Sequence, residues 1–373
     1  MKRFFGLLKY FDWYLVINTI LLMIFSLATL YSLQLNVNNP NYTVFHRQLI
    51  FVALGLVVFF LISSINYRTW GDFYKVIIIA TLIIMAGVLF LGVTIRGTSG
   101  WVRFFGQTFQ PVELAKIGLI IFLAKYFSIH GQNPKIFKKI GLAAIPVMAL
   151  VLLVVRQPDL GSAMILFLTF LGLVFLLPLR KKHLLTILVI ILVLSTVFWL
   201  FFLQDYQKDR LLTFVQPQRD PLGTGYNVTQ AIVSVGSGRL FGRGLGLGSQ
   251  SQLNFLPEQQ TDFIFAVIAE ELGFVGSGLL LLMFFSLFMR IFWIARATSD
   301  NFGQLFALGI LIYLSLQTIV NIAMNMGMAP VTGIPLPLVS YGGSSLLSVL
   351  IGLGIVQSLY IKGRQSIFER SDS

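Results

Sequence analysis

Two carboxylates mark the junction between a long polar segment and a long apolar run. Asp262 stands at the start of the apolar run, and Glu258 lies about one helical turn before it. A carboxylate in a partly dry site at a membrane boundary can act as a general base. It can also cap a helix N-terminus or interact with the helix dipole. Glu258 is either a second reactive carboxylate or a solvated loop residue.

A second candidate site lies shortly after residue 100. Glu113 and Lys116 follow Pro111 at the start of an apolar run, and a spacing of three places both on one helix face. They could form an internal ion pair that offsets its own desolvation, or Lys116 could also face an anionic ligand. Arg103 and Trp101, on the preceding loop, would then flank that ligand.

Three further carboxylates favour structural roles. Asp159 directly precedes an apolar run, which suits a helix cap with Arg156 as its counter-ion. Glu270 and Glu271 lie deeper in the run that follows Asp262. Carboxylates inside a membrane are costly and are usually functional or paired. For this pair we expect hydrogen bonding rather than a proton relay.

Two other patterns carry little information about chemistry. Alternate residues from Gly242 to Gly248 are glycine, but no strand precedes them and no lysine–serine pair follows. A phosphate-binding loop is therefore a weak interpretation, and a flexible external segment is the better one. The three histidines, His46, His130 and His183, are too scattered to form a metal cluster or a triad.

The composition places these residues in a membrane protein. The chain has 373 residues, of which 57% are hydrophobic and 11% are charged, too few charges for a soluble domain of this size. The net charge of +13 suits cytoplasmic loops and anionic lipids, whereas a nucleic-acid partner would need a basic soluble face. The absence of cysteine excludes disulfides and a thiolate nucleophile.

Apolar runs of about 20 residues predict an all-α polytopic membrane protein with about ten transmembrane helices. We expect a single integral membrane domain, 1–373, with a long external loop, 204–261, between the seventh and eighth helices. The segment from Met326 to Ser345 is too rich in proline and glycine for a helix and too apolar for a free loop, so it should dip back into the membrane inside the protein. The expected spans are 13–35, 48–65, 76–95, 111–128, 140–155, 160–178, 184–203, 263–289, 303–325 and 343–361.

Lysine and arginine gather on alternate connections, which predicts that both termini are cytoplasmic. The opposite short loops hold only Arg47, Arg96, Arg103 and Arg156. Long loops do not obey the charge rule, so the basic residues of 204–261 do not contradict this orientation. The basic set is Lys2, Arg3, Lys9, Arg68, Lys75, Lys135, Lys138, Lys139, Arg180, Lys181, Lys182, Arg290, Arg296, Lys362, Arg364 and Arg370.

Taken together, five motifs resemble the SEDS (shape, elongation, division and sporulation) family, which includes the RodA and FtsW branches. They occur in the family's order over nearly the whole chain, and the last two are quite specific. The compact length is more similar to the RodA branch. The motifs are Trp101–Arg103, Gln110–Lys116, Gln157–Gly161, Pro257–Gly273 and Pro335–Ser345.

The resemblance implies a peptidoglycan glycosyltransferase of cell elongation and shape in the bacterial cytoplasmic membrane. Such enzymes polymerise lipid II, a disaccharide-peptide on undecaprenyl pyrophosphate, at the outer face of that membrane, and they work with a class B penicillin-binding protein. The family's essential aspartate corresponds to Asp262, and its glutamate and lysine to Glu113 and Lys116. Gln259 and Gln260 depart from the family's usual histidine before Thr-Asp, which puts a role for that histidine in doubt.

On this hypothesis, Asp262 removes the proton from the acceptor 4-hydroxyl, which attacks the donor anomeric carbon with inversion. The leaving pyrophosphate needs cations. A divalent cation could also bind it, although the sequence shows no dedicated cage. A lipid II flippase is the rival interpretation, since ten helices and interrupted segments also suit a transporter. A non-catalytic scaffold is a third, and it would not need Asp262. The candidate cations are Lys116, Arg103, Arg210, Arg219, Arg239 and Arg243.

Overall fold

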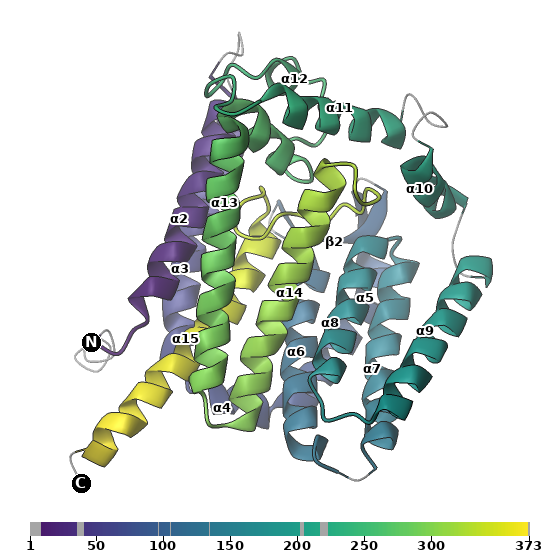
Figure 1. Ribbon diagram of the computed structural model, residues 1–373, viewed down its shortest axis with the longest axis vertical. Coiled ribbons are helices and arrows are strands. Elements are labelled where there is room, and N and C mark those ends of the chain that lie inside the picture. The colour runs from purple at the N-terminus through teal and green to yellow at the C-terminus, as the bar shows by residue number, and fades with distance from the viewer. Residues whose placement is uncertain are drawn as a thin grey trace.

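The computed structural model is a helical bundle with a cap of short helices and loops at one end (Figure 1). It describes residues 9–35, 41–95, 97–104, 106–133, 135–201, 205–216 and 223–371. The helices are α2 (Trp13–Ser32), α3 (Thr43–Ser64), α4 (Tyr67–Asp72), α5 (Tyr74–Leu91), α6 (Pro111–His130), α7 (Ile136–Arg156), α8 (Leu160–Phe175), α9 (Lys181–Phe201), α10 (Asp205–Val215), α11 (Thr224–Ser237), α12 (Ser249–Gln252), α13 (Ile264–Ala297), α14 (Asn301–Asn325) and α15 (Gly343–Ser371).

Each predicted span overlaps one long helix of the bundle, which confirms a polytopic helical membrane protein. Among the described residues, seven helices are long and apolar enough to cross a membrane, namely α2, α3, α5, α7, α13, α14 and α15. Helix α8 is apolar but has only 16 residues. The count of ten crossings therefore stays a prediction.

Helix α6 lies at the centre of the bundle. It contributes to both hydrophobic clusters, one formed with α2, α3, α13, α14 and α15, the other with α5, α7 and α8. Most of its residues are buried, including Glu113 and Lys116. A helix enclosed by protein can carry polar side chains that lipid would not tolerate. Its position therefore provides the enclosed surroundings that the two charged residues need.

The segment between α14 and α15 is non-helical, as predicted, and its second half is buried at Ile334 and from Leu336 to Ser340. It returns beside α14, where the Asn321 amide donates to the Ile334 carbonyl at 2.8 Å and the Gln317 amide donates to the Pro335 carbonyl at 3.0 Å. Gln317 lies two helical turns before the end of α14. The segment therefore dips into the bundle and is held there by side-chain amides.

A small antiparallel sheet precedes α6, and the sequence analysis did not predict it. Strand β2 (Thr98–Phe104) lies between β1 (Val93–Ile95) and β3 (Gln107–Phe109). Trp101 pairs with Val93, and Arg103 pairs with Thr108. Edge strands expose unpaired backbone groups, which lipid cannot satisfy, so this sheet belongs at the water-facing end of the bundle.

Helix α13 contains a sharp break at Gly273, where φ is +67° and ψ is −162°. The glycine-rich segment packs against this break: the Arg243 and Gly244 amides donate to the Glu270 and Glu271 carbonyls, both at 3.0 Å. A Cβ on Gly242 would lie 2.1 Å from the Glu271 carbonyl oxygen. The glycines thus permit close backbone contact between this segment and the break in α13, a contact that the sequence analysis did not predict.

The two ends of the helical bundle differ in content. Helix α2 begins, and α15 ends, at the end opposite to α10, α11 and α12 (Figure 1). The small helix α4 also lies at that opposite end. This arrangement agrees with termini on one side and the 204–261 segment on the other. Which side is cytoplasmic follows only from the charge asymmetry.

We expect a cysteine at Ser237, in the 204–261 segment, to react with a membrane-impermeant maleimide added to intact cells. A cysteine at the exposed Gln132, between α6 and α7, should react only after permeabilisation. The chain has no native cysteine, so each label reports one position. The reverse pattern would contradict the predicted orientation.

Candidate functional site

Asp262 ends a tight turn that leads into α13. The Asp262 amide donates to the Glu258 carbonyl at 3.1 Å, and Glu258 has a positive φ of +51°. The N-cap of α13 is Phe263, which forms no side-chain cap. Asp262 itself is partly buried. The turn therefore presents Asp262 just before the N-cap residue of α13, at the positive end of the helix dipole.

The peptides just before and at Asp262 are held on three sides. The Tyr341 amide donates to the Gln260 carbonyl at 2.8 Å, and the Ser340 hydroxyl donates to the Thr261 carbonyl. The Asp262 carbonyl accepts from the Asn321 and Asn325 amides, both at 3.0 Å. Three successive carbonyls thus have partners from outside the turn, which fixes the backbone that carries the carboxylate.

The carboxylate of Asp262 lies close to the 326–342 segment at Gly333, which is exposed. A Cβ built on Gly333, which has φ of +70°, would lie 3.7 Å from Oδ2 of Asp262. Glu258 is exposed, and its Oε2 accepts from the Thr261 hydroxyl at 3.2 Å. This turn contact favours the interpretation of Glu258 as a loop carboxylate rather than a second base.

The two glutamines before Thr261 contribute through different groups. Gln259 is buried, and its amide donates to the Asn254 side chain at 3.1 Å. Gln260 accepts the Tyr341 amide through its main chain. A main-chain contact does not depend on the side chain, so glutamine in place of the family's histidine leaves this part of the turn intact.

Glu113 and Lys116 form the buried ion pair that the sequence predicted. Their charged atoms are 2.6 Å apart, and each side chain is only 2% exposed. Lys116 Nζ also lies 5.5 Å from the centre of the Tyr313 ring. Oε2 of Glu113 and the Tyr313 hydroxyl form no hydrogen bond of standard geometry, although the two groups interact electrostatically. Removing either charge would leave the other buried without compensation.

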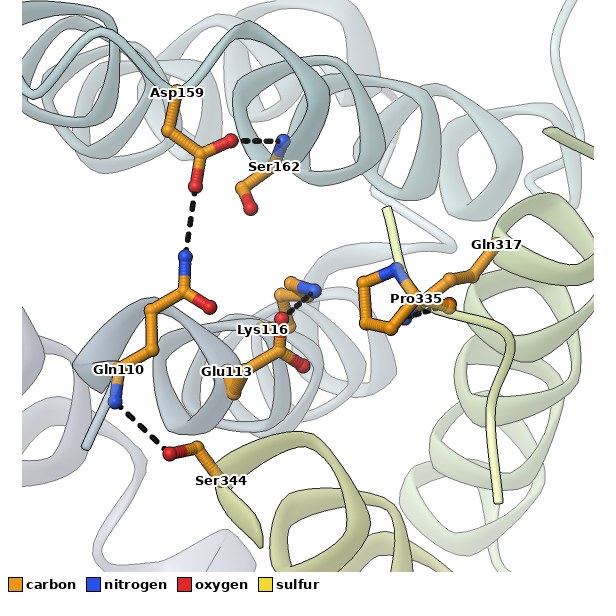
Figure 2. A network of polar contacts seen from close by, with 8 residues as sticks. All are labelled: Gln110, Glu113, Lys116, Asp159, Ser162, Gln317, Pro335 and Ser344. Atoms are coloured by element: carbon orange, nitrogen blue, oxygen red, sulfur yellow. Dashed lines mark hydrogen bonds and ion pairs between the residues drawn. The ribbon is translucent and has the colours of Figure 1, made fainter. Parts of the chain in front are cut away.

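A polar network around this pair joins three helix N-termini (Figure 2). Asp159 Oδ1 accepts the Ser162 amide at 2.9 Å and caps α8, as predicted. Gln110 donates from its side chain to Asp159 Oδ2 at 3.0 Å and from its main chain to the Ser344 hydroxyl at 3.0 Å. Gln110 thereby connects the starts of α6, α8 and α15, a role that the sequence analysis missed.

Asp159 is partly buried in polar surroundings. Burial raises the pKa of the Asp159 carboxyl above its usual range, and the Ser162 hydrogen bonds and the Lys116 charge oppose that rise. Among the ion pairs of the described residues, none joins Asp159 to Arg156. Gln110, rather than an arginine, therefore donates to Oδ2, the carboxylate oxygen of Asp159 that does not cap α8.

One stripe of α14 connects the two sites. Tyr313, Gln317, Asn321 and Asn325 recur every fourth residue, share one helix face, and are fully buried. Tyr313 contacts Lys116, and Asn325 contacts Asp262. Twelve residues of helix span about 18 Å. Lys116 therefore lies well below the Asp262 peptide along the axis of α14.

The predicted arginines are dispersed over the capped end. Arg103 is exposed on β2. Arg239 is exposed at the end of α11, and its carbonyl accepts the Phe274 amide at 2.8 Å. Arg243 donates to the Ser249 hydroxyl at 2.8 Å. Arg210 lies in α10, but its side chain, like all of Arg219, is outside the described residues.

Glu270 and Glu271 have the structural role that the sequence predicted. Glu270 accepts the Gln250 and Ser251 amides at 2.8 and 3.0 Å. Glu271 accepts the Gly246 amide at 3.1 Å and the Ser32 hydroxyl. Both carboxylates are buried and anchor the glycine-rich segment to the break in α13. They therefore stabilise the cap rather than a proton path.

An apolar groove of about 900 Å³ runs between α3, α5, α6 and α15. Its walls include Leu54, Ile84, Leu114 and Leu347 from these four helices. It extends from the sheet at one end to α4 at the other. The groove thus offers room for a long apolar group.

Within the described part of the chain, no cluster of three or more histidine, aspartate or glutamate side chains could hold a metal ion.

Comparison with known proteins gives a consistent family match. Residues 8–365 match the FtsW, RodA and SpoVE family, described as cell cycle proteins. The chain is 36% identical over 343 residues to peptidoglycan glycosyltransferase MrdB of Escherichia coli K12, covering 92% of each chain. It is 34% identical over 352 residues to stage V sporulation protein E of Bacillus subtilis, covering 92% of this chain and 95% of that one.

Solved structures give the same match. One solved structure shares 31% identity with this chain and a TM-score of 0.80, covering 95% of this chain and 99% of that one. It is described as the structural coordination of polymerization and crosslinking by a peptidoglycan synthase complex. Thermus thermophilus rod shape determining protein RodA shares 30% identity and a TM-score of 0.70, covering 94% of this chain and 96% of that one.

We expect Lys116→Ala to lower the free energy of unfolding by about 3–5 kcal/mol, because it strands the buried Glu113 charge. The double variant Glu113→Gln with Lys116→Met should recover much of this loss. Lys125→Ala is the matched control on the same helix, since its ion pair with Asp72 spans 3.5 Å and Asp72 is 69% exposed. That control should cost at most about 1 kcal/mol. Equal losses for Lys116→Ala and Lys125→Ala in thermal unfolding would contradict the buried-pair account.

Proposed function

The chain belongs to the FtsW, RodA and SpoVE family, and we propose that Asp262 is the general base of its reaction. The chain is a peptidoglycan glycosyltransferase of bacterial cell wall synthesis. Relatives that match it over most of their length carry the name peptidoglycan glycosyltransferase. Its substrate on this proposal is lipid II. The single observation that carries the assignment is a carboxylate on a rigidly held turn at the start of α13.

The reaction follows from a positioned carboxylate. The acceptor sugar's 4-hydroxyl gives its proton to Asp262 as its oxygen attacks the anomeric carbon of the donor. The new glycosidic bond forms as the bond to the pyrophosphate oxygen breaks, with inversion at that carbon. Undecaprenyl pyrophosphate leaves with the electron pair. A positioned general base contributes about 10²–10⁴ in rate.

The groove supports lateral entry of a lipid-linked substrate. Its walls are almost entirely apolar, which suits a polyprenyl tail, and it reaches the sheet at the capped end. Thr108 and Phe109 of β3 line the groove, and Thr108 pairs with Arg103 across the sheet. Cross-strand partners share a face. Arg103 is therefore a candidate contact for the phosphates at the mouth of the groove.

The leaving pyrophosphate needs positive charge. Arg103, Arg210, Arg219 and Arg239 remain the proposed ligands. Lys116 is neutralised by Glu113 and lies about three helical turns below the Asn325 level. We therefore propose that Lys116 stabilises the packing of α6 against α14 beneath the site and does not contact phosphate directly. A divalent cation would have to bind through the substrate's own phosphates, an arrangement that suits Mg²⁺.

The remaining proposals concern location and partners. We place the active site on the outer face of the cytoplasmic membrane, with both termini in the cytoplasm. The relative whose title joins polymerization to crosslinking supports a class B penicillin-binding protein as the partner. A flippase is the weaker alternative, since relatives that match this chain over most of their length are named as glycosyltransferases.

Asp262→Asn should abolish glycan polymerisation while the protein stays folded. The amide is nearly isosteric but cannot accept the hydroxyl proton at neutral pH, so the rate should fall by about 10²–10⁴. The measurement is polymer formed from labelled lipid II by the purified protein with its partner. Glu258→Gln serves as the matched control and should keep most of the activity. Substantial polymer from Asp262→Asn, with folded protein confirmed by thermal unfolding, would place the base elsewhere.

A further inference from the structure

We propose that Asn321 and Asn325 are positioning residues that aim the Asp262 carboxylate, an inference that rests on the proposed role of Asp262. Both lie on α14, one turn apart, and both are fully buried. Each donates a hydrogen bond to the same acceptor, the Asp262 carbonyl, at 3.0 Å. Because both side chains are fully buried and contact the main chain of Asp262, they would act through the backbone of Asp262.

The donors of the two amides are fully used. Asn321 donates to the Asp262 carbonyl and, at 2.8 Å, to the Ile334 carbonyl. Asn325 donates to the Asp262 carbonyl and, at 2.8 Å, to the Asn321 carbonyl. An amide with both N–H groups engaged has a single orientation, and a buried donor without a partner is costly. Each of the two side chains is therefore held in one orientation.

Asn325 also caps α13 from a neighbouring helix. Its Oδ1 accepts the Ala266 amide at 3.0 Å. Phe263, the N-cap residue, has no side-chain acceptor for a first-turn amide. One side chain thus binds the first turn of α13 through its oxygen and the Asp262 carbonyl through its nitrogen. Asn325 therefore fixes both the start of α13 and the orientation of the Asp262 peptide.

Asn321 connects Asp262 to the wall beside its carboxylate. Ile334, whose carbonyl it binds, directly follows Gly333, and a Cβ built on Gly333 would lie 3.7 Å from Asp262 Oδ2. Asn321 of α14 therefore fixes the position of the Asp262 peptide relative to the 326–342 segment. Misplacing a reacting group by about 1 Å can cost about 10² in rate, even when the change lies away from the chemistry.

A purely structural role would give a different result from a positioning role. Loss of a cap or a buried hydrogen bond lowers stability, but the remaining folded enzyme would turn over normally. Loss of aim lowers kcat of the folded enzyme and leaves KM nearly unchanged, because the substrate contacts remain. The split between kcat and KM therefore separates the two roles.

The experiment compares Asn321→Leu, Asn325→Leu and their double variant in the full chain with its partner, using labelled lipid II. Leucine has a similar volume and no donor. Each single variant leaves the Asp262 carbonyl one donor, so kcat should fall by less than about tenfold. The double variant removes both, and its kcat should fall by about 10² or more, exceeding the product of the single effects.

The matched control is Asn18→Leu. Asn18 is buried on α2 and donates to the Ser286 hydroxyl at 2.6 Å, beyond the break in α13. The Asn18→Leu variant loses a side-chain hydrogen bond between two helices, at a place away from the Asp262 turn. Asn18→Leu should lower the melting temperature by a similar amount to either single variant, with kcat within about twofold of the native enzyme.

Asp262→Asn, measured in parallel, separates failure of this inference from failure of the proposed base. An inactive Asp262→Asn with a normal kcat in the folded double variant would leave the base in place and overturn the positioning role. A raised KM with normal kcat would overturn it too. An active Asp262→Asn would remove the base assignment and this inference with it. If the double variant does not fold, the single variants decide: normal kcat in both would refute the inference.

Discussion

Irregular backbone inside a membrane protein persists only when its amides and carbonyls find partners within the protein. The 326–342 segment meets this constraint through side chains of its neighbours. Gln317 and Asn321 bind the Pro335 and Ile334 carbonyls, and Gln48 of α3 donates weakly to the Ser340 carbonyl at 3.4 Å. In return, the segment supplies the hydroxyl and amide that hold the turn before Asp262. The buried segment and the proposed base therefore depend on each other.

The same constraint explains how charge is distributed in the bundle. Glu113 and Lys116 neutralise each other where both are almost fully buried. Asp159 and the Glu270–Glu271 pair are occupied by main-chain amides. Asp262 differs in position, because it stands just before the start of α13, its carbonyl is held by two side-chain amides, and its Oδ2 lies close to Gly333. A carboxylate on a rigidly held backbone is an arrangement suited to proton transfer.

Much of the site could be predicted where the signal is local. Asp159 precedes a helix, and Glu113 and Lys116 share a helix face, so spacing alone indicated a cap and an ion pair. Long-range partners could not be predicted this way. Asn321 and Asn325 look like ordinary polar residues near a helix end until the fold brings the Asp262 turn beside them. The break at Gly273 was hidden because the glycine lies in an otherwise helical apolar run.

The central claim is that a carboxylate at position 262 accepts the proton, and the cysteine-free chain permits a direct chemical test. Asp262→Cys should be inactive with labelled lipid II. Alkylation with iodoacetate adds a carboxylate at that position, whereas iodoacetamide adds a neutral amide of nearly the same size. The alkylated side chain is two atoms longer than aspartate, so the account predicts that iodoacetate restores polymerisation only in part and that iodoacetamide restores none. Equal polymer after both reagents, or an active unmodified Asp262→Cys, would contradict it.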